Sequence, residues 1–190
     1  MIKKRKFHYI LVILPDAKRP DRLWCFDEKG HFAVLNAVTG KFEVPWKSIT
    51  NAKTSGVLLY DSNMDRIVIS RMDADSGWII TGYGRGTGSL DGIFEFSLKS
   101  DLNCAENLKS LSIHPERNDL LALILENSLL IVKVSQDNWN PETISLPEMR
   151  CDTIQWGPEE NDPITGEKGC KIVLVNRETK QMTLFTLSAI

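Results

Sequence analysis

The sequence of 190 residues has little net charge and few groups of the kind that carry catalysis. Its 23 Lys and Arg residues nearly balance 25 Asp and Glu residues, and the net charge is −2. No overall electrostatic attraction therefore favours nucleic acid or an anionic membrane as a partner. The three histidines are isolated in the sequence, and no nucleophile motif of the form Gly-x-Ser-x-Gly occurs. We expect a protein without enzymatic activity, metal or cofactor.

Paired cysteines are missing as well. Without a Cys-x-x-Cys pair or a nearby group of histidines, a zinc site has no support, and free buried thiols in a cytoplasmic protein are expected. Two disulfides in an exported protein are the alternative that an even cysteine count leaves open. The four cysteines are Cys25, Cys104, Cys151 and Cys170.

Long hydrophobic runs are also absent, and no stretch approaches the roughly 20 apolar residues of a membrane helix. The apolar residues 7–14 follow the basic stretch Lys3–Lys6 in the manner of a secretory signal. The run is short, contains His8 and lacks a small-residue cleavage site. We therefore predict a buried strand there, and a cytoplasmic protein with the nucleus as the alternative location.

Short apolar runs bounded by turn-forming residues make up most of the chain. Segments such as GVLLY, RIVISRM, DLLALIL and SLLIVKV are rich in Val, Ile and Leu, and they lie between Gly, Pro, Asn, Asp or Ser. Helical periodicity is almost missing. This pattern predicts an all-β protein of about fifteen strands with frequent tight connections.

One local pattern occurs four times: a buried residue, one spacer, then Pro or Asp, a polar run and an apolar strand. The spacings between successive copies are 46, 54 and 43 residues. We interpret the copies as the starts of four repeat units of a single domain spanning residues 1–190, approximately 7–50, 51–105, 106–150 and 151–190. The copies are Ile13-x-Pro15, Leu59-x-Asp61, Ile113-x-Pro115 and Trp156-x-Pro158.

These units resemble degenerate WD40 repeats, the blades of a β-propeller, which have four strands and a period of about 40–45 residues. The segment GHFAVLNAVTGKFEVP at 30–45 is similar to the third strand, turn and fourth strand of such a blade. The Trp-Asp pair of the family is missing from every unit. The resemblance implies about four blades, in a four-bladed or an incomplete, open propeller.

A two-sheet β-sandwich is the alternative fold, since it produces the same alternation and similar turn spacing. Within the propeller interpretation, residues 6–14 add a strand to the last blade and close the ring, or the edge of an open arc is covered by another chain. Stacking of meanders is expected in either case, because a single meander leaves its faces uncovered.

The glycine-rich stretch ITGYGRGTGSLDGIFEF at 79–95 is not a phosphate-binding loop. A strand follows it instead of a helix, and no Gly-x-Gly-x-x-Gly register or Walker lysine is present. We interpret it as an extended connection between the third and fourth strands of the second unit. Tyr83, Arg85 and Asp91 are its candidate partner-binding residues, because Tyr and Arg are common interface anchors.

Two tryptophans lie in polar connections, and we add Trp46 and Trp139 to the candidate partner-binding residues. The segment DSNMDR at 61–66 resembles the start of a calcium loop but lacks its glycine and its bidentate Glu. The predicted function is a non-catalytic protein-interaction scaffold or complex subunit, whose partners are other proteins or a second copy. A domain that binds a small ligand, calcium or carbohydrate, is the alternative.

Overall fold

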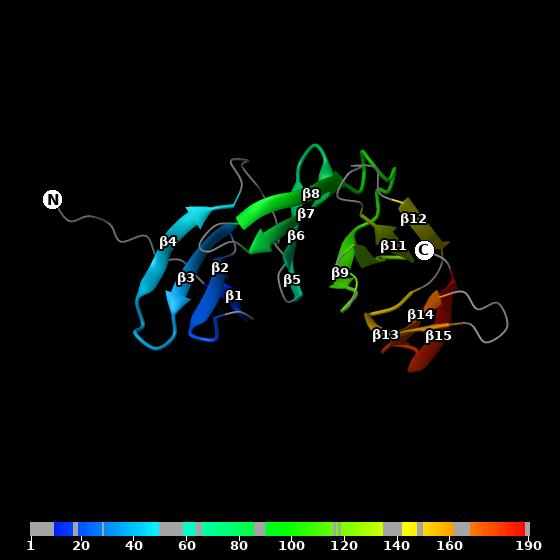
Figure 1. The fold of residues 1–190 in the computed structure, drawn as a ribbon. Coiled ribbons are helices and arrows are strands. Elements are labelled where there is room, and N and C mark those ends of the chain that lie inside the picture. Colours follow the sequence, from blue (N-terminus) through cyan, green and yellow to red (C-terminus); the bar gives the residue numbers. More distant parts are fainter. Residues whose placement is uncertain are drawn as a thin grey trace. The chain divides into compact units, whose positions relative to one another are not determined.

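Four antiparallel sheets follow one another along the chain (Figure 1). All fifteen elements among the described residues are strands. The computed structural model describes residues 10–16, 19–27, 29–49, 59–63, 66–85, 90–115, 117, 119–134, 142–147, 150–161 and 168–188.

Each sheet is a meander in which hydrogen-bonded neighbours are also neighbours in sequence. The first sheet contains β1 (Ile10–Pro15), β2 (Arg22–Asp27), β3 (His31–Asn36) and β4 (Phe42–Ser48). The second contains β5 (Leu59–Asn63), β6 (Arg66–Asp73), β7 (Gly77–Arg85) and β8 (Leu90–Ser97). The third contains β9 (Leu108–Ile113), β10 (Leu120–Leu125), β11 (Ser128–Lys133) and β12 (Glu142–Pro147). The fourth contains β13 (Thr153–Asn161), β14 (Lys168–Asn176) and β15 (Gln181–Ser188).

This topology confirms the all-β prediction, and the described strands form four successive sheets instead of the two packed sheets of the sandwich alternative. The four copies of the repeated pattern fall in the first strand of each sheet or at its end, in β1, β5, β9 and β13. Each sheet lies within one of the four predicted repeat units. The single-domain organisation stays a prediction, since the chain divides into two compact units, residues 1–93 and 94–190.

Within the first unit, a hydrophobic cluster joins the first sheet to the second. Trp24, Phe26 and Val34 are fully buried in it, together with Ile67 from β6. The ring of Trp24 stacks on that of Phe32, with centroids 5.8 Å apart. Alternate residues of β2 and β3 thus face one core, as period-two patterning requires.

Strand β1 belongs to this first sheet, which corrects the proposed closure of a ring by the N-terminal strand. Ile13 pairs with Cys25 and Leu14 with Trp24, while Val12 and Leu14 pack against the cluster. Residues 6–9 of the proposed closing strand lie outside the described residues. The apolar side chains of β1 are better covered by the sheet that follows them in sequence.

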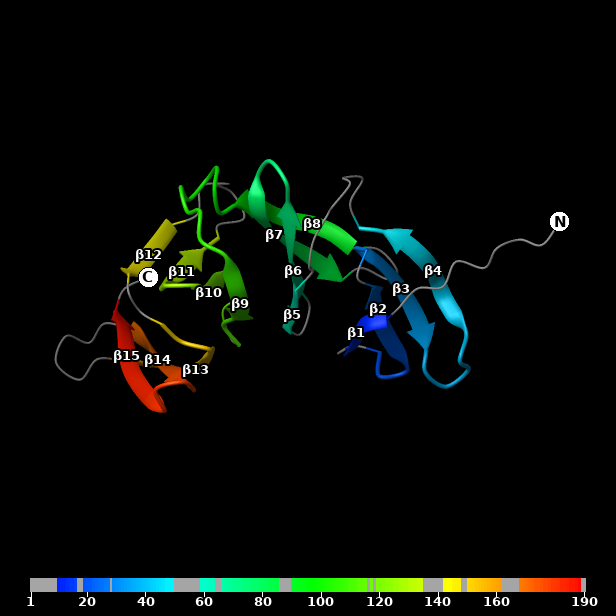
Figure 2. The same ribbon diagram turned by 180° about the vertical axis from the view of Figure 1, so that it is seen from behind.

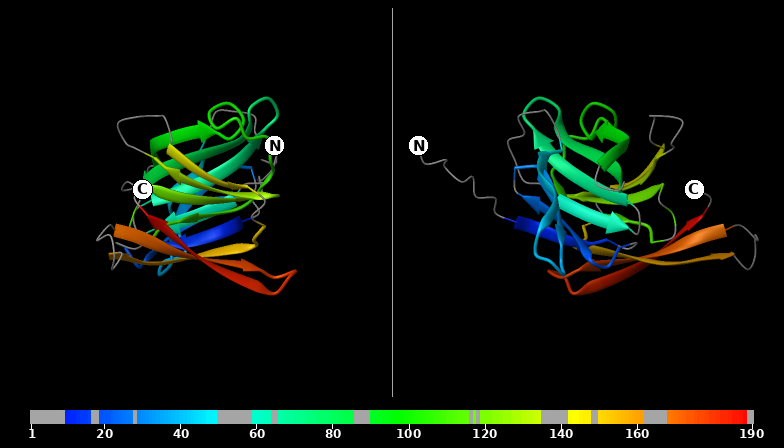
Figure 3. Two further views of the ribbon diagram at one scale, coloured as in Figure 1. Left: turned by 90° about the vertical axis from the view of Figure 1, so that its right-hand side faces the viewer. Right: turned by 60° about the vertical axis from the view of Figure 1, so that its left-hand side comes forward.

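Within the second unit, a second cluster joins the third and fourth sheets. Both sheets contribute, with Leu120, Ala122, Leu129 and Ile131 on one side and Ile172 on the other, each at most 1% exposed. Figure 2 shows this unit from behind, with β13, β14 and β15 side by side. The twist of the fourth sheet, drawn in orange to red, is seen in Figure 3.

The glycine-rich stretch is largely strand, which corrects its interpretation as an extended connection. Gly82 pairs with Val68 and Gly84 with Arg66, so these glycines lie inside β7. The connection between β7 and β8 is therefore limited to residues 86–89, which are outside the described residues. Its place between the third and fourth strands of the second sheet is as predicted.

The four cysteines are free, and Cys25, Cys151 and Cys170 are buried. Burial raises the pKa of the Cys25 and Cys151 thiols, because an apolar environment disfavours the thiolate. None of the described residues belongs to a helix of the length and hydrophobicity that a membrane span needs.

Candidate functional site

The outer strand of the fourth sheet carries the most exposed apolar side chains of any described strand. Met182 is 73% exposed and Leu184 is 62% exposed. Both lie on β15, which forms one edge of a sheet of three strands, β13-β14-β15. The other three sheets have four strands each, so their third strands are covered on both edges.

Met182 and Leu184 belong to an apolar patch on one face of the fourth sheet. Strands β14 and β15 pair without a register shift from Gly169–Ser188 to Asn176–Gln181, which places Leu184 opposite Val173 and Met182 opposite Val175. Residues opposite each other on an antiparallel pair share a face. We call Val173, Val175, Met182 and Leu184 the β15 patch.

The opposite face of the fourth sheet is held against the third sheet. Phe185 and Leu187 of β15 point to the core shared with β10 and β11. The indole Nε1 of Trp156 donates a hydrogen bond to Ser112 Oγ, 3.1 Å away. The two sheets are thus joined by apolar packing and by at least one polar contact across their boundary.

A buried His–Cys pair lies at the same boundary. The backbone N–H of Arg117 donates to His114 Nδ1 at 3.0 Å, so this nitrogen is the acceptor and the neutral ring carries its proton on Nε2. Nε2 then donates to Cys170 Sγ at 3.2 Å. With His114 fully buried and Cys170 at 5% exposure, the pair is a structural contact, not an accessible nucleophile.

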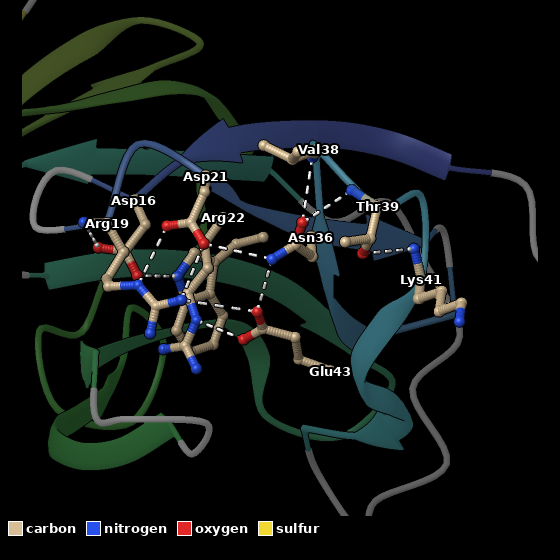
Figure 4. A network of polar contacts seen from close by, with 10 residues as sticks. Asp16, Arg19, Asp21, Arg22, Asn36, Val38, Thr39, Lys41 and Glu43 are labelled. Carbon is tan, nitrogen blue, oxygen red and sulfur yellow. Dashed lines mark hydrogen bonds and ion pairs between the residues drawn. The ribbon is translucent and has the colours of Figure 1, made fainter.

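A network of polar side chains lies at the turns of the first sheet (Figure 4). Arg19 binds Asp21 through two hydrogen bonds of 3.0 and 2.8 Å, and Arg22 Nε donates to Glu43 at 2.6 Å. Asn36 Nδ2 donates to both carboxylates, at 3.2 Å to Asp21 and 2.9 Å to Glu43. We call these five residues the turn network.

The turn network stabilises the ionised carboxylates. The Arg19 hydrogen bond lowers the pKa of Asp21, and hydrogen bonds from Asn36 and Arg22 lower that of Glu43. The donors and carboxylates of the network hydrogen-bond one another within the chain. Because these groups are exposed, their net effect on the free energy of unfolding is small. The network therefore fixes the β1–β2 and β3–β4 turns and offers a surface of mixed charge.

Of the predicted partner-binding residues, the structure describes the side chains of Tyr83 and Trp46. Tyr83 is 8% exposed and packs in the cluster between the first two sheets, which corrects its assignment to a surface contact. Arg85 ends β7 and Asp91 lies in β8, but their side chains are not among those described. Trp139 lies outside the described residues.

Trp46 lies on β4, an edge strand of the first sheet. It is half-buried, and its ring meets that of Phe42 with centroids 6.1 Å apart at 55°. Phe42 is 48% exposed. Strand β4 thus carries these two rings as well as Glu43 of the turn network.

The two acidic segments lie in a strand and in a turn. Asp61 and Asn63 lie in β5, paired with Val68 and Arg66, so that segment forms a hairpin strand. Asp73 Oδ1 accepts the N–H groups of Asp75 and Ser76 at 3.0 and 2.9 Å, an Asx turn. Within the described residues no group of three or more His, Cys, Asp or Glu is placed to hold a metal ion.

Sequence reasoning recognised MTLFTL as a strand but missed the β15 patch. A signal was present, because residues 181–188 contain no charge, proline or glycine. Strands at the edge of a sheet usually contain charged residues or prolines, which protect them against pairing with another chain. The prediction had no means of knowing that this strand would end its sheet.

Solved structures with the same fold are β-propellers. The β-propeller domain of Cps50 (Swd1) from Myceliophteria thermophila matches with a TM-score of 0.67 and 15% identity, over 94% of this chain and 54% of that chain. A chain of the mitotic checkpoint complex matches with a TM-score of 0.53 and 11% identity, over 95% and 51% of the two chains. A chain in the complex of the fission yeast SREBP-SCAP binding domains matches with a TM-score of 0.50 and 13% identity, over 98% and 51%.

The four sheets are therefore blades of a WD40-like β-propeller fold, as the repeat pattern predicted. This chain spans about half the length of the solved chains that it matches. No protein-family model matches the sequence, and no curated protein sequence is significantly similar to it.

Proposed function

We propose that this chain is a non-catalytic protein-interaction module, a subunit of a multiprotein complex, and that its fourth blade is a partner-binding surface. The observation that carries the proposal is the β15 patch, where Met182 and Leu184 are 73% and 62% exposed on an edge strand. Water contact with these side chains is unfavourable by about 25 cal/mol per Å² of apolar surface. A partner that covers them removes that cost.

The fold supports this proposal in a general way. Within each unit, blades that share a hydrophobic core present exposed edges and turns, and two of the structural matches were solved as parts of protein complexes. Fold alone does not specify function, whereas the exposed apolar side chains of β15 are a feature of this chain itself. The cytoplasm is the location that free buried thiols favour, with the nucleus as the alternative.

The first blade and the β7–β8 connection supply the secondary contacts in this proposal. Trp46 and Phe42 offer aromatic anchors on β4, and aromatic and Arg residues dominate binding energy at many interfaces. Arg85 and Asp91 flank the β7–β8 connection. Tyr83 takes no direct part, because it is buried.

The test is quantitative recovery of partners with matched variants of the β15 patch. Tagged chain is expressed in cells, cross-linked in place and purified, and the recovered proteins are compared between wild type, Leu184→Lys and Val38→Lys. Val38 is the control, since it is 82% exposed in the β3–β4 turn of another blade.

We expect a defined set of other proteins with wild type and with the Val38 variant, and a loss of at least about tenfold with Leu184→Lys. Each recovered protein is then purified and its binding to the three chains measured by calorimetry. Recovery of the same proteins at equal levels with all three chains, or direct binding unaffected by Leu184→Lys, contradicts the proposed role of the fourth blade.

A further inference from the structure

The eight edge strands of the four sheets differ in their protection against pairing with another chain. Natural edge strands are usually protected by charged residues, prolines or bulges. Seven of the eight described edge strands contain a charge or a proline in their sequence. Examples, one per strand, are Pro15 (β1), Pro45 (β4), Asp61 (β5), Glu95 (β8), Lys109 (β9), Glu142 (β12) and Glu160 (β13).

Strand β15 is the exception among these eight. Its eight residues, QMTLFTLS, are uncharged and contain neither proline nor glycine. Its pairing with β14 runs through all eight residues without a register shift. In an antiparallel pair, successive residues direct their N–H and C=O groups alternately toward and away from the neighbouring strand. About half of the residues of β15 therefore present backbone donors and acceptors at an edge that has no bulge, charge or proline.

From these features we propose that β15 pairs with β15 of a second copy of this chain, antiparallel across a twofold axis. The inference rests on one part of the proposed function, the fourth blade as a partner-binding surface, and it identifies the partner at the β15 edge as a second copy. The lack of charge favours self-pairing, because a charged strand placed against its own copy brings like charges together, and that is unfavourable. The two sheets of three strands become one continuous sheet.

The register of this pairing follows from symmetry. A twofold axis perpendicular to the sheet leaves each residue on the same face in both copies, so a residue is opposite one of its own face. Placing the axis at Leu184 pairs residues 181–187 of one copy with residues 187–181 of the other, which uses nearly the whole strand.

This register also covers the exposed side chains of the β15 patch. Leu184 lies opposite Leu184 of the second copy, and Met182 lies opposite Thr186 with Leu184 as its diagonal neighbour, within reach of a long side chain. Both copies thus contribute the same self-complementary surface, as an isologous dimer requires.

The oligomeric state of the purified chain is the first test. Light scattering on the full chain across a dilution series is expected to show a mass of twice 21.5 kDa that falls toward the monomer on dilution. Leu184→Lys is expected to weaken dimerisation at least tenfold, because it places like charges opposite each other. Val38→Lys, at the 82% exposed control position, is expected to leave dimerisation unchanged.

A charge-complementation experiment separates this contact from general surface effects. Leu184→Lys and Leu184→Glu are each expected to be monomeric alone, and an equimolar mixture is expected to form a heterodimer. The circular dichroism spectra of all three samples should be the same, which shows that the variants fold. A mixture that stays monomeric overturns the proposed register.

Cysteine cross-linking then tests the axis directly. In a Cys104→Ser background, which removes the half-buried free thiol, Leu184→Cys is expected to form an intermolecular disulfide under mild oxidation. Val38→Cys, at a more exposed position in the β3–β4 turn of the first sheet, is expected to remain reduced under the same conditions.

The outcomes distinguish this inference from the proposed function. A wild-type chain that is monomeric at all concentrations, or a dimer insensitive to Leu184→Lys, overturns self-pairing through β15. If other proteins are still lost from the Leu184→Lys purification, the proposed function stands and the partner strand is theirs. If a dimer forms but no other protein is recovered, self-pairing stands and the role as a subunit of a larger complex fails.

Discussion

Strands β11 and β15 are both third in their sheets, and both pair with the second strand on one side, yet their environments are opposite. In β11 the residues from Ser128 to Val132 are buried, whereas in β15 those from Gln181 to Leu184 are exposed. The difference in position is that β12 covers the far edge of β11, and no described strand covers β15.

The sequences of the two strands have adapted to this difference only in part. In β11 both faces are apolar, with Leu129 and Ile131 in the core shared with the fourth sheet and Leu130 and Val132 buried on the other face. Strand β15 contains two threonines, Thr183 and Thr186, among its apolar residues, but Met182 and Leu184 remain on the exposed face. The comparison teaches that β15 keeps part of the composition of a covered strand.

The largest effect is expected from truncating one leucine in each of the two strands, a buried one in β11 and an exposed one in β15. Leu129→Ala should lower the free energy of unfolding by about 2–5 kcal/mol, because it leaves a cavity in a fully buried cluster. Leu184→Ala should change it by less than about 0.5 kcal/mol, since its side chain is 62% exposed. Urea denaturation in dilute solution, where the chain is monomeric, measures both.

The proposed difference between β11 and β15 is contradicted if Leu184→Ala is as destabilising as Leu129→Ala under those conditions. That result means that Leu184 is packed within a single chain. Repeating the measurement at high concentration provides the control, because only self-association makes the Leu184→Ala effect depend on concentration.

Strands β11 and β15 also show how much of the fold can be predicted from the sequence. Short apolar runs with period-two patterning identified MTLFTL and SLLIVKV as strands, and the spacing of Ile113-x-Pro115 and Trp156-x-Pro158 placed each in the correct sheet. Local sequence thus carries both the strand and its order, because each meander pairs neighbours in sequence.

Exposure was not predictable in the same way. Tyr83 stands among glycines, a local pattern typical of a surface loop, yet it is buried because β7 continues through Gly84 and places the ring in the core cluster. Leu184 stands in a pattern typical of a buried strand, yet it is exposed. Both depend on which neighbouring strand is present, and that is a property of the sheet and not of the segment.

A smaller effect is expected from glycine substitutions that test how tightly the fourth sheet is packed away from its exposed edge. A Cβ at Gly157 would lie 3.0 Å from Lys171 Cβ and 3.1 Å from Lys171 O on the paired strand. Gly157→Ala should therefore cost about 1–3 kcal/mol of unfolding free energy. At Gly92, on edge strand β8, nothing lies within 4 Å of such an atom.

Gly92→Ala is the matched control, and thermal unfolding of the two variants makes the comparison. The Gly92 variant should be unchanged or slightly stabilised, because alanine reduces the entropy of the unfolded chain. Equal stability of both variants would show that β13 and β14 separate easily, and that the fourth sheet is loose throughout and not at β15 alone.

The smallest effect concerns the hydrogen bond that joins the third sheet to the fourth, on the face opposite the β15 patch. Trp156 Nε1 donates to Ser112 Oγ at 3.1 Å, and the Trp156 ring also meets His114 edge-on with centroids 5.0 Å apart. Trp156→Phe alone removes packing as well as the bond, so it is combined with Ser112→Ala in a double-mutant cycle. The coupling free energy should be about 1 kcal/mol, the usual net value of such a bond, measured by urea denaturation.

A coupling near zero would mean that apolar packing alone holds the fourth blade on the third. The blade would then owe its position to its core residues, among them Ile172 of β14 and Phe185 and Leu187 of β15. Strand β15 would thus help to attach the blade through one face and expose the β15 patch on the other.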